Sequence, residues 1–180
     1  MKSRLQAVLL SAAVALAGFT AVTYTACKED KCKGIVCAYG GVCNEGRCLC
    51  LPGYEGVQCE TINRDRYKGV WQVAEDGTLS SESLYSVSIE NGEAMTDILV
   101  KRLYNDALGG DVVATIKGDT LTIPTQTLGD YTIKGRGMLL DDIYYGKHGR
   151  LEVRYSVTNN VTGTNDNFGL DSGQVSLWHK

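Results

Sequence analysis

The chain has 180 residues, of which 43% are hydrophobic and 22% are charged, and its formal net charge is −3. This composition is that of a globular protein, so it excludes a wholly disordered chain and a collagen-like repeat. The net negative charge gives no basis for a nucleic-acid partner, because phosphate backbones are bound by basic surfaces. All seven cysteines lie between positions 27 and 59, which leaves the remaining two thirds of the chain free of cysteine.

The N-terminus predicts an export signal over residues 1–26. Lys2 and Arg4 form a basic start, and residues 5–26 carry no charge and are rich in Ala, Leu and Val. That arrangement is typical of a secretory signal peptide. A permanent transmembrane anchor is the alternative, since about 20 apolar residues span a bilayer, but several Ser, Gly and Thr residues make this segment only mildly apolar.

Residues 24–27, Tyr-Thr-Ala-Cys, place small residues directly before a cysteine. They resemble the lipobox of bacterial lipoproteins, and most closely the relaxed form of Bacteroidota. The resemblance implies lipidation of Cys27 and attachment to the bacterial outer membrane at the cell surface. In that group an acidic stretch after the cysteine can direct surface export, and residues 28–30, Lys-Glu-Asp, look like one. Residues 27–31 would then form a lipidated tether.

Cleavage by an ordinary signal peptidase, after Ala17 or Ala26, is the alternative to lipidation. Removal of residues 1–26 leaves 16 basic and 21 acidic residues, a net charge of −5. Because lasting membrane attachment needs more than one acyl chain, a triacylated Cys27 meets the requirement for an anchor.

Six further cysteines follow at positions 32, 37, 43, 48, 50 and 59. In an exported chain this density indicates disulfides, because so short a segment cannot bury enough core to offset its chain entropy. A zinc site is the weaker interpretation, since the segment has no His and no Cys-x2-Cys pair. The spacing alone leaves the pairing of the six cysteines open.

Residues 48–59, Cys-Leu-Cys-Leu-Pro-Gly-Tyr-Glu-Gly-Val-Gln-Cys, resemble the end of an EGF-like domain, which would cover residues 32–59. In that family Gly53 and Gly56 form tight turns of a hairpin and Tyr54 packs on the small core. The resemblance implies three disulfides, which are Cys32–Cys43, Cys37–Cys48 and Cys50–Cys59.

Some EGF-like domains bind Ca²⁺ through oxygens that lie just before the first cysteine. Here Lys31 occupies one of those positions, and residues 44–47 lack the expected Asx and aromatic side chains. Because Ca²⁺ takes six to eight oxygen ligands, we expect no calcium site in this segment and no metal site elsewhere.

A short charged linker, residues 60–66, leads to a predicted β domain over residues 67–180. Apolar residues there recur with the period of two that is typical of strands. The clearest runs are Tyr67-x-Gly69-x-Trp71-x-Val73, Tyr85-x-Val87-x-Ile89, Val112-x-Ala114-x-Ile116, Leu151-x-Val153-x-Tyr155-x-Val157 and Val175-x-Leu177. Turn signals such as Gly118-Asp119 separate the runs. We therefore expect a mainly β fold, an antiparallel barrel or sandwich of about 8–9 strands.

Gly69-Val70-Trp71 on the first of these strands resembles the G-x-W motif of lipocalins and other calycins. In that family the tryptophan closes the base of a barrel that carries small apolar ligands. Residues 121–126 also look like a segment of compact β domains in uncharacterised Bacteroidota lipoproteins, a resemblance that implies no activity.

The sequence predicts no catalytic residues and no cofactor. His148 lies in a glycine-flanked turn and His179 is the penultimate residue, so neither is placed as a general base. Asp141 and Asp142 are neighbours in a predicted strand, where successive side chains point to opposite faces. Gly135-Arg136-Gly137 lies in a strand and is interpreted as a bulge or bend, because it does not form a phosphate loop.

Five aromatic residues of the β domain could line a ligand or glycan site, because Tyr offers both an apolar face and a hydroxyl. They are Tyr104, Tyr144, Tyr145, Phe168 and Trp178; the alternative is that they belong to the core and its rim. The polar stretch 158–167 is expected to be a long mobile loop.

Taken in order along the chain, these features predict a non-enzymatic, lipid-anchored cell-surface protein. An EGF-like module would present a β domain for recognition or adhesion to a protein or glycan ligand. A lipocalin-like carrier of a small apolar ligand is the alternative. A secreted hydrolase is the third and least supported hypothesis, because catalysis needs ionisable groups that converge.

Overall fold

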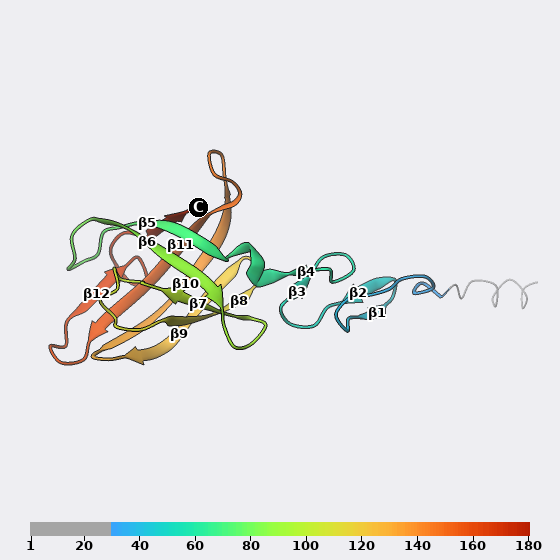
Figure 1. Cartoon of the computed structure of the whole chain (residues 1–180), viewed down its shortest axis with the longest axis horizontal. Coiled ribbons are helices and arrows are strands. Elements are labelled where there is room, and N and C mark those ends of the chain that lie inside the picture. The colour runs from blue at the N-terminus through green and yellow to red at the C-terminus, as the bar shows by residue number, and fades with distance from the viewer. Residues whose placement is uncertain (1–29) are drawn as a thin grey trace, which may run out of the picture.

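The computed structural model describes residues 30–180, so the predicted signal peptide and Cys27 lie outside the described residues. The chain forms a small disulfide-bonded module followed by a β-barrel, and the module extends from one end of the barrel (Figure 1). The expectation of a mainly β fold is confirmed, and of the two architectures considered the barrel is the one observed.

The disulfide module, residues 30–62, contains two small antiparallel hairpins. Its strands are β1 (Val42–Asn44), β2 (Arg47–Leu49), β3 (Tyr54–Glu55) and β4 (Thr61–Ile62). Disulfides join Cys32 to Cys43, Cys37 to Cys48 and Cys50 to Cys59, which are the three pairs that the resemblance implies. Since few side chains of the module are buried, these bridges take the place of an apolar core.

The predicted linker is ordered. Its residues Thr61 and Ile62 pair with β3, and Asn63–Arg66 form one turn of 3-10 helix, η1. Asn63 is buried and its backbone N–H donates to the carbonyl of Gly53, so the turn is fixed to the module as well as to the barrel.

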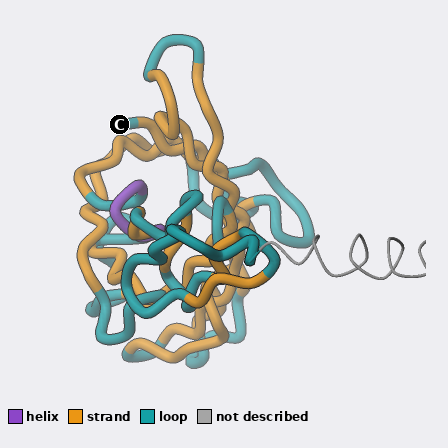
Figure 2. Tube along the Cα trace, turned by 90° about the vertical axis from the view of Figure 1, so that its right-hand side faces the viewer, coloured by secondary structure: helices purple, strands orange, loops and turns teal. Residues whose placement is uncertain are grey.

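Nine strands form the barrel sheet. They are β5 (Gly69–Glu75), β6 (Ser83–Asn91), β7 (Asp97–Lys101), β8 (Val112–Lys117), β9 (Thr120–Leu128), β10 (Tyr131–Asp142), β11 (Gly146–Asn159), β12 (Asn165–Phe168) and β13 (Ser176–His179). Neighbours in sequence are antiparallel neighbours in space from β5 to β11, and β13 lies between β11 and β5. This pairing closes an eight-stranded antiparallel barrel, and β12 continues the edge of β11 beyond β13. Figure 2, seen from the module side, shows the strands surrounding the barrel axis.

Residues 158–167 are not a mobile loop, and here the structure corrects the prediction. The segment forms the end of β11, a short turn and the first three residues of β12, where Thr158 is the register partner of Asn165. Asp166 and Asn167 are buried. Polar side chains are typical of loops, but here both side chains accept backbone N–H groups of neighbouring segments.

The last strand is also corrected. The apolar alternation Val175-x-Leu177 predicted that these two residues face inward, but the inward residues are Ser176 and Trp178, and Leu177 is exposed. Ser176 is tolerated inside because its hydroxyl donates to the carboxylate of Glu75. Packing of Trp178 in the barrel therefore decides which side of the strand faces inward.

The barrel has a closed end beside the module. There Trp71 is fully buried and its indole Nε1 donates to the carbonyl oxygen of Tyr67 at 2.7 Å. Lys180 crosses the same end: its Nζ donates to the carbonyls of Arg66 and Lys68 and lies 4.9 Å from the centroid of the Trp71 ring. Gly69 has a φ of +121°, which an L-residue rarely adopts and which starts β5 beside η1.

The opposite end, which we call the mouth, is formed by the loops 76–82, 102–111, 129–130 and 160–164. Because strands alternate in direction, these loops meet at the end away from η1. Hydrogen bonds connect them, for example from the N–H of Asn160 to the carbonyl of Asp130. The module and the mouth thus lie at opposite ends of the barrel (Figure 1).

Candidate functional site: the mouth of the barrel

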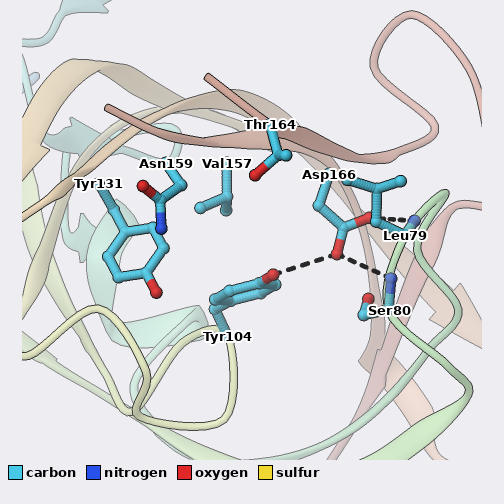
Figure 3. A pocket seen from close by; sticks show the side chains of 8 residues that line it. All are labelled: Leu79, Ser80, Tyr104, Tyr131, Val157, Asn159, Thr164 and Asp166. Carbon is cyan, nitrogen blue, oxygen red and sulfur yellow. Dashed lines mark hydrogen bonds between the residues drawn. The ribbon is translucent and has the colours of Figure 1, made fainter. Parts of the chain in front are cut away.

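A pocket of about 260 Å³ opens at the mouth. Its lining comes from four segments that are distant in sequence, and consists of Leu79, Ser80, Tyr104, Tyr131, Val157, Asn159, Thr164 and Asp166 (Figure 3). The wall combines two aromatic rings with hydroxyl, amide and carboxylate groups. Asp166 is the one charged side chain among these lining residues.

Asp166 organises the mouth. One carboxylate oxygen accepts the backbone N–H of Leu79 at 2.9 Å, and the other accepts the N–H of Ser80 at 3.2 Å and the hydroxyl of Tyr104 at 3.1 Å. A residue of β12 therefore fixes both the β5–β6 loop and the β7–β8 loop. The hydroxyl of Thr78 is a fourth donor to this carboxylate at 3.4 Å, so the first role of Asp166 is to shape the pocket.

The same contacts set the charge of the pocket. Burial acts to raise the pKa of Asp166, but the hydrogen bonds from Ser80, Leu79 and Tyr104 outweigh it and leave that pKa below its ordinary value. Burial, together with the nearby Asp166 carboxylate, raises the pKa of Tyr104 to about 12. At neutral pH the pocket therefore holds an anionic Asp166 and a neutral Tyr104.

Two groups of the pocket wall remain available to a ligand. Within the described residues, no hydrogen bond joins the hydroxyl of Tyr131 or the Nδ2 of Asn159 to another protein group, whereas Asn159 Oδ1 accepts the N–H groups of Val161 and Thr162. The ring of Tyr131 meets the edge of Tyr104 at a centroid distance of 6.3 Å. The arrangement can bind a small polar molecule by hydrogen bonds on one side and ring contact on the other.

The floor of the mouth is aromatic. Phe168 stacks on Tyr155 with ring centroids 4.4 Å apart, and its edge meets Tyr104 at 5.9 Å. Below this layer the inward side chains fill the barrel, and Trp71, Trp178 and most of the aliphatic residues between them are at most 2% exposed. The mouth pocket is thus a shallow site above a packed core.

A buried carboxylate lies inside this core. Glu75, at the end of β5, accepts hydrogen bonds from the hydroxyls of Tyr85 at 2.7 Å, Tyr155 at 2.8 Å and Ser176 at 2.7 Å. Ser176 in turn accepts the indole N–H of Trp178. The hydroxyl of Tyr85 also accepts the backbone N–H of Tyr104, which connects Glu75 to the pocket wall.

Burial raises the pKa of Glu75, and the negative charge of Asp166 acts in the same direction, while the three hydroxyl donors oppose the shift. Burial likewise raises the pKa values of Tyr85 and Tyr155 well above their usual range. The cluster therefore carries at most one negative charge, which three hydroxyl groups solvate in place of water.

Sequence reasoning missed Glu75, Tyr131, Asn159 and Asp166. The sequence pattern could have indicated Glu75, because it follows Trp71 and Val73 in the inward-facing positions of β5. A carboxylate at such a position is costly unless it is hydrogen-bonded, so it predicts a buried polar cluster. The other three could not be found from the local pattern, since their neighbours in the pocket come from other strands.

The aromatic residues singled out from the sequence do not form one site. Tyr104 lines the mouth and Phe168 forms its floor, whereas Trp178 is core. Tyr144 and Tyr145 lie on the β10–β11 hairpin at the closed end, where Tyr144 is 87% exposed and Tyr145 stacks on His179 at 4.7 Å.

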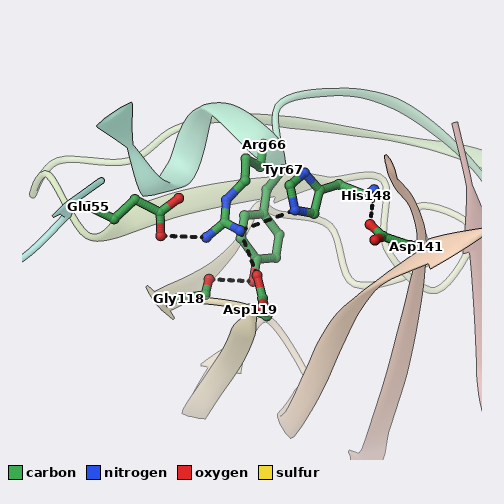
Figure 4. A network of polar contacts seen from close by, with 7 residues as sticks. All are labelled: Glu55, Arg66, Tyr67, Gly118, Asp119, Asp141 and His148. Atoms are coloured by element: carbon green, nitrogen blue, oxygen red, sulfur yellow. Dashed lines mark hydrogen bonds and ion pairs between the residues drawn. The ribbon is translucent and has the colours of Figure 1, made fainter. Parts of the chain in front are cut away.

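At the closed end, Arg66 joins the module to the barrel (Figure 4). Its guanidinium lies 2.9 Å from the carboxylate of Glu55 in β3 and 2.6 Å from that of Asp119 in the β8–β9 turn. His148 Nε2 is 3.3 Å from the same guanidinium, and the backbone N–H of His148 donates to the carboxylate of Asp141. His148 and Asp141, which were considered from the sequence as candidate catalytic residues, therefore belong to the junction between module and barrel, at the end away from the mouth pocket.

The glycines and the tyrosine identified in the module have structural positions. Gly53 has a φ of +90° and packs so closely on Met95 of the β6–β7 turn that an added Cβ would lie 2.7 Å from Met95 Cγ. Gly56 has a φ of +97°, and Tyr54 stacks on Tyr39 with centroids 4.5 Å apart. Gly53 thus allows the module to approach the barrel.

Two further findings concern the described residues 30–180. No group of three or more His, Cys, Asp or Glu side chains in this part of the chain is arranged to hold a metal ion. No helix in the same range is long and apolar enough to cross a membrane.

Comparison with known proteins adds little. No protein-family model and no curated protein matches the chain. A structural-genomics protein of unknown function from Bacteroides ovatus has a similar structure over 63% of this chain, with 14% sequence identity and a TM-score of 0.39. The chain spans 42% of the length of that protein. A similarity of this size carries no argument about function, which depends here on the geometry of the site.

Proposed function

We propose that the protein is a non-enzymatic, lipid-anchored cell-surface protein that recognises a small polar or glycan ligand at the mouth of its barrel. The observation that carries the proposal is the arrangement of the two ends. The module that follows the predicted lipid anchor is fixed to the closed end, and the polar pocket opens at the other end.

The EGF-like module serves as a spacer in this proposal. Its three disulfides make it rigid without a large core, and Arg66, Gly53 and η1 fix it to the barrel. A rigid spacer orients the mouth away from the membrane, which is what a receptor for extracellular ligands needs. A lipid on Cys27 supplies the anchor, and the acidic residues after it direct the protein to the outer surface.

The location is tested by replacing Cys27 with Ser and fractionating the cells. We expect the wild-type protein in the outer membrane and accessible to external protease, and the Cys27→Ser variant in soluble fractions. Membrane association that survives the substitution would refute the lipid anchor.

Recognition is tested by screening the mature chain from residue 28 onward on arrays of glycans and proteins. We expect capture of ligands that present several hydroxyl groups, because the free Tyr131 hydroxyl and Asn159 amide are suited to them. A screen without any specific ligand would count against the proposal.

A carrier of small apolar ligands remains the second candidate, because the closed eight-stranded barrel and the buried Trp71 are what the calycin resemblance implies. It needs an interior cavity of several hundred Å³. The mouth pocket is smaller than that and mostly polar, so the recognition proposal is better supported.

A further inference from the structure

A basic patch occupies the outer wall of the barrel, along β10 and β11. Its members project outward from β10 and β11 and are Lys134, Arg136, Arg150 and Arg154; we call it the arginine face. The chain as a whole is acidic. A local excess of positive charge on an acidic protein marks a surface for anionic partners.

Two of these arginines oppose each other directly. Arg136 of β10 and Arg154 of β11 are register partners in the antiparallel pair, and both line the same hollow. Like charges in opposite positions of two strands destabilise a sheet. The pairing therefore costs stability unless an anion lies between the two guanidinium groups.

Acidic neighbours neutralise only part of the face. Glu152 lies 3.4 Å from Arg150 and 3.6 Å from Arg154, and Asp142 lies 3.8 Å from Arg150. Within the described residues, neither Arg136 nor Lys134 has a carboxylate within 4 Å. Arg136 is exposed, so its guanidinium is free to form paired hydrogen bonds with a carboxylate or sulfate group.

The shape of the face indicates an extended ligand. One hollow of about 360 Å³ lies on one side of Arg136, with Met138, Leu140 and Arg154 in its wall. A second hollow of about 470 Å³ lies on the other side, with Lys134, Thr122 and the carboxylate-bearing Asp171 in its wall. Arg136 and Thr120 line both hollows, so the arginine lies between two adjoining hollows.

Arg136 follows an irregularity in the pairing of β10 with β9. Between Ile133 and Gly135 the register shifts by one residue, and the extra residue lies in β9, between Gln126 and Ile123. Gly135 is required there, because an added Cβ would lie 2.6 Å from the Cβ of Tyr155 on the inner side. The Gly-Arg-Gly sequence thus combines a packed inner side with an outward arginine.

We propose that the arginine face binds an acidic polysaccharide, with carboxylate or sulfate groups held at Arg136 and Arg154 and adjacent sugar units in the two hollows. Threonine hydroxyls and the apolar Met138 and Leu140 match the polar edge and apolar face of a sugar ring. None of the residues that line the two hollows is aromatic, so the face lacks the stacking platforms that single-stranded nucleic acids use.

The test uses the mature chain with Cys27→Ser, and measures its affinity for heparin and for polygalacturonate, with neutral dextran as the uncharged probe. We expect salt-sensitive binding to at least one of the two acidic polymers and none to dextran. The double variant Arg136→Gln/Arg154→Gln should lose at least about tenfold in affinity, because each arginine supplies charge-assisted hydrogen bonds.

The control removes the same charge elsewhere: Lys33→Gln/Arg47→Gln alters two basic residues of the module and should retain the wild-type affinity. The Arg136→Gln/Arg154→Gln variant should melt close to the wild-type temperature, because the relieved repulsion between the two arginines offsets the lost ion pair of Arg154 with Glu152, and this separates lost binding from lost folding. Unchanged affinity in that variant, or binding to neither acidic polymer, would overturn the proposal. Tighter binding to a DNA oligonucleotide or to phosphatidylglycerol vesicles, lost in the same variant, would also overturn the assignment to a polysaccharide.

Discussion

Glu75 shows how a single residue decides the character of the core. The residue is 6% exposed, and its carboxylate has three hydroxyl donors in place of a cation. Truncation removes one acceptor and leaves three buried hydroxyls to find new partners, which is more costly than removing the whole cluster. We expect Glu75→Ala to lower the free energy of unfolding by about 2–4 kcal/mol, as measured by urea denaturation. A loss below that of an exposed substitution such as Glu82→Ala would contradict the account.

The pH dependence of stability follows from the same residue. Because the folded state raises the pKa of Glu75 above its ordinary value of 4.5, the folded protein retains a proton that the unfolded chain has already released. Stability due to Glu75 is therefore fully present below pH 4.5 and declines as the pH rises through the raised pKa. Relative to Glu75→Gln, which does not titrate, the wild type should lose stability over this interval in denaturation curves. A difference that is independent of pH would show that Glu75 has an ordinary pKa.

At the scale of single elements, the close packing of β10 against β11 depends on Gly135. Gly135 faces Tyr155 so closely that a Cβ would also lie 2.7 Å from the carbonyl oxygen of Arg154, a backbone atom that cannot move aside. Gly135→Ala should destabilise the barrel by about 1–3 kcal/mol through overpacking. Gly118→Ala is the matched control, since its Cβ meets nothing within 4 Å and only the left-handed φ of +58° opposes it, at about 1 kcal/mol. Equal thermal shifts for the two variants would disprove the close contact.

The sequence predicted strands correctly where apolar and polar residues alternate strongly. The prediction failed where polar residues face inward. β11 was predicted from the alternation of Leu151, Val153, Tyr155 and Val157. The hairpin turn between β8 and β9 was predicted from Gly118-Asp119. β12 and the phase of β13 were missed, because Asp166 and Ser176 are buried through partners on distant strands. The mouth pocket could not be predicted for the same reason, as closure of the barrel alone brings its residues together.

At the scale of the whole molecule, the module and the barrel depend on different forces. Three disulfides stabilise the module, each by about 2–4 kcal/mol. The barrel instead has a continuous apolar core, and its sequence after Cys59 contains no cysteine. Reduction with dithiothreitol should therefore unfold the module and leave the barrel intact. Amide hydrogen exchange after reduction should show lost protection in residues 30–62 and retained protection in β5–β11. Loss of protection throughout the barrel would contradict this independence.

The junction between the two parts depends on Arg66. Its side chain is only 16% exposed and joins Glu55 to Asp119. Arg66→Gln should leave both parts folded but widen the range of module orientations, with a loss of about 1 kcal/mol in stability, the upper end for surface ion pairs. In small-angle scattering, a wider range of module orientations should appear as a broader distribution of molecular dimensions. Lys31→Gln breaks an exposed ion pair inside the module and should leave that distribution unchanged; an Arg66→Gln profile identical to wild type would exclude the rigid junction.

We place the binding of small polar or glycan ligands at the mouth, at the end opposite the tether and apart from the arginine face. The most direct measurement compares ligand capture by three forms of the mature chain: wild type, Tyr131→Ala/Asn159→Ala at the mouth, and Tyr144→Ala on the exposed hairpin at the closed end. For a ligand that array screening identifies and whose capture does not require Arg136 and Arg154, we expect wild type and Tyr144→Ala to retain binding and the mouth variant to lose at least about tenfold in affinity, with all three equally folded. Equal capture by the mouth variant, or a loss confined to Tyr144→Ala, would contradict this placement.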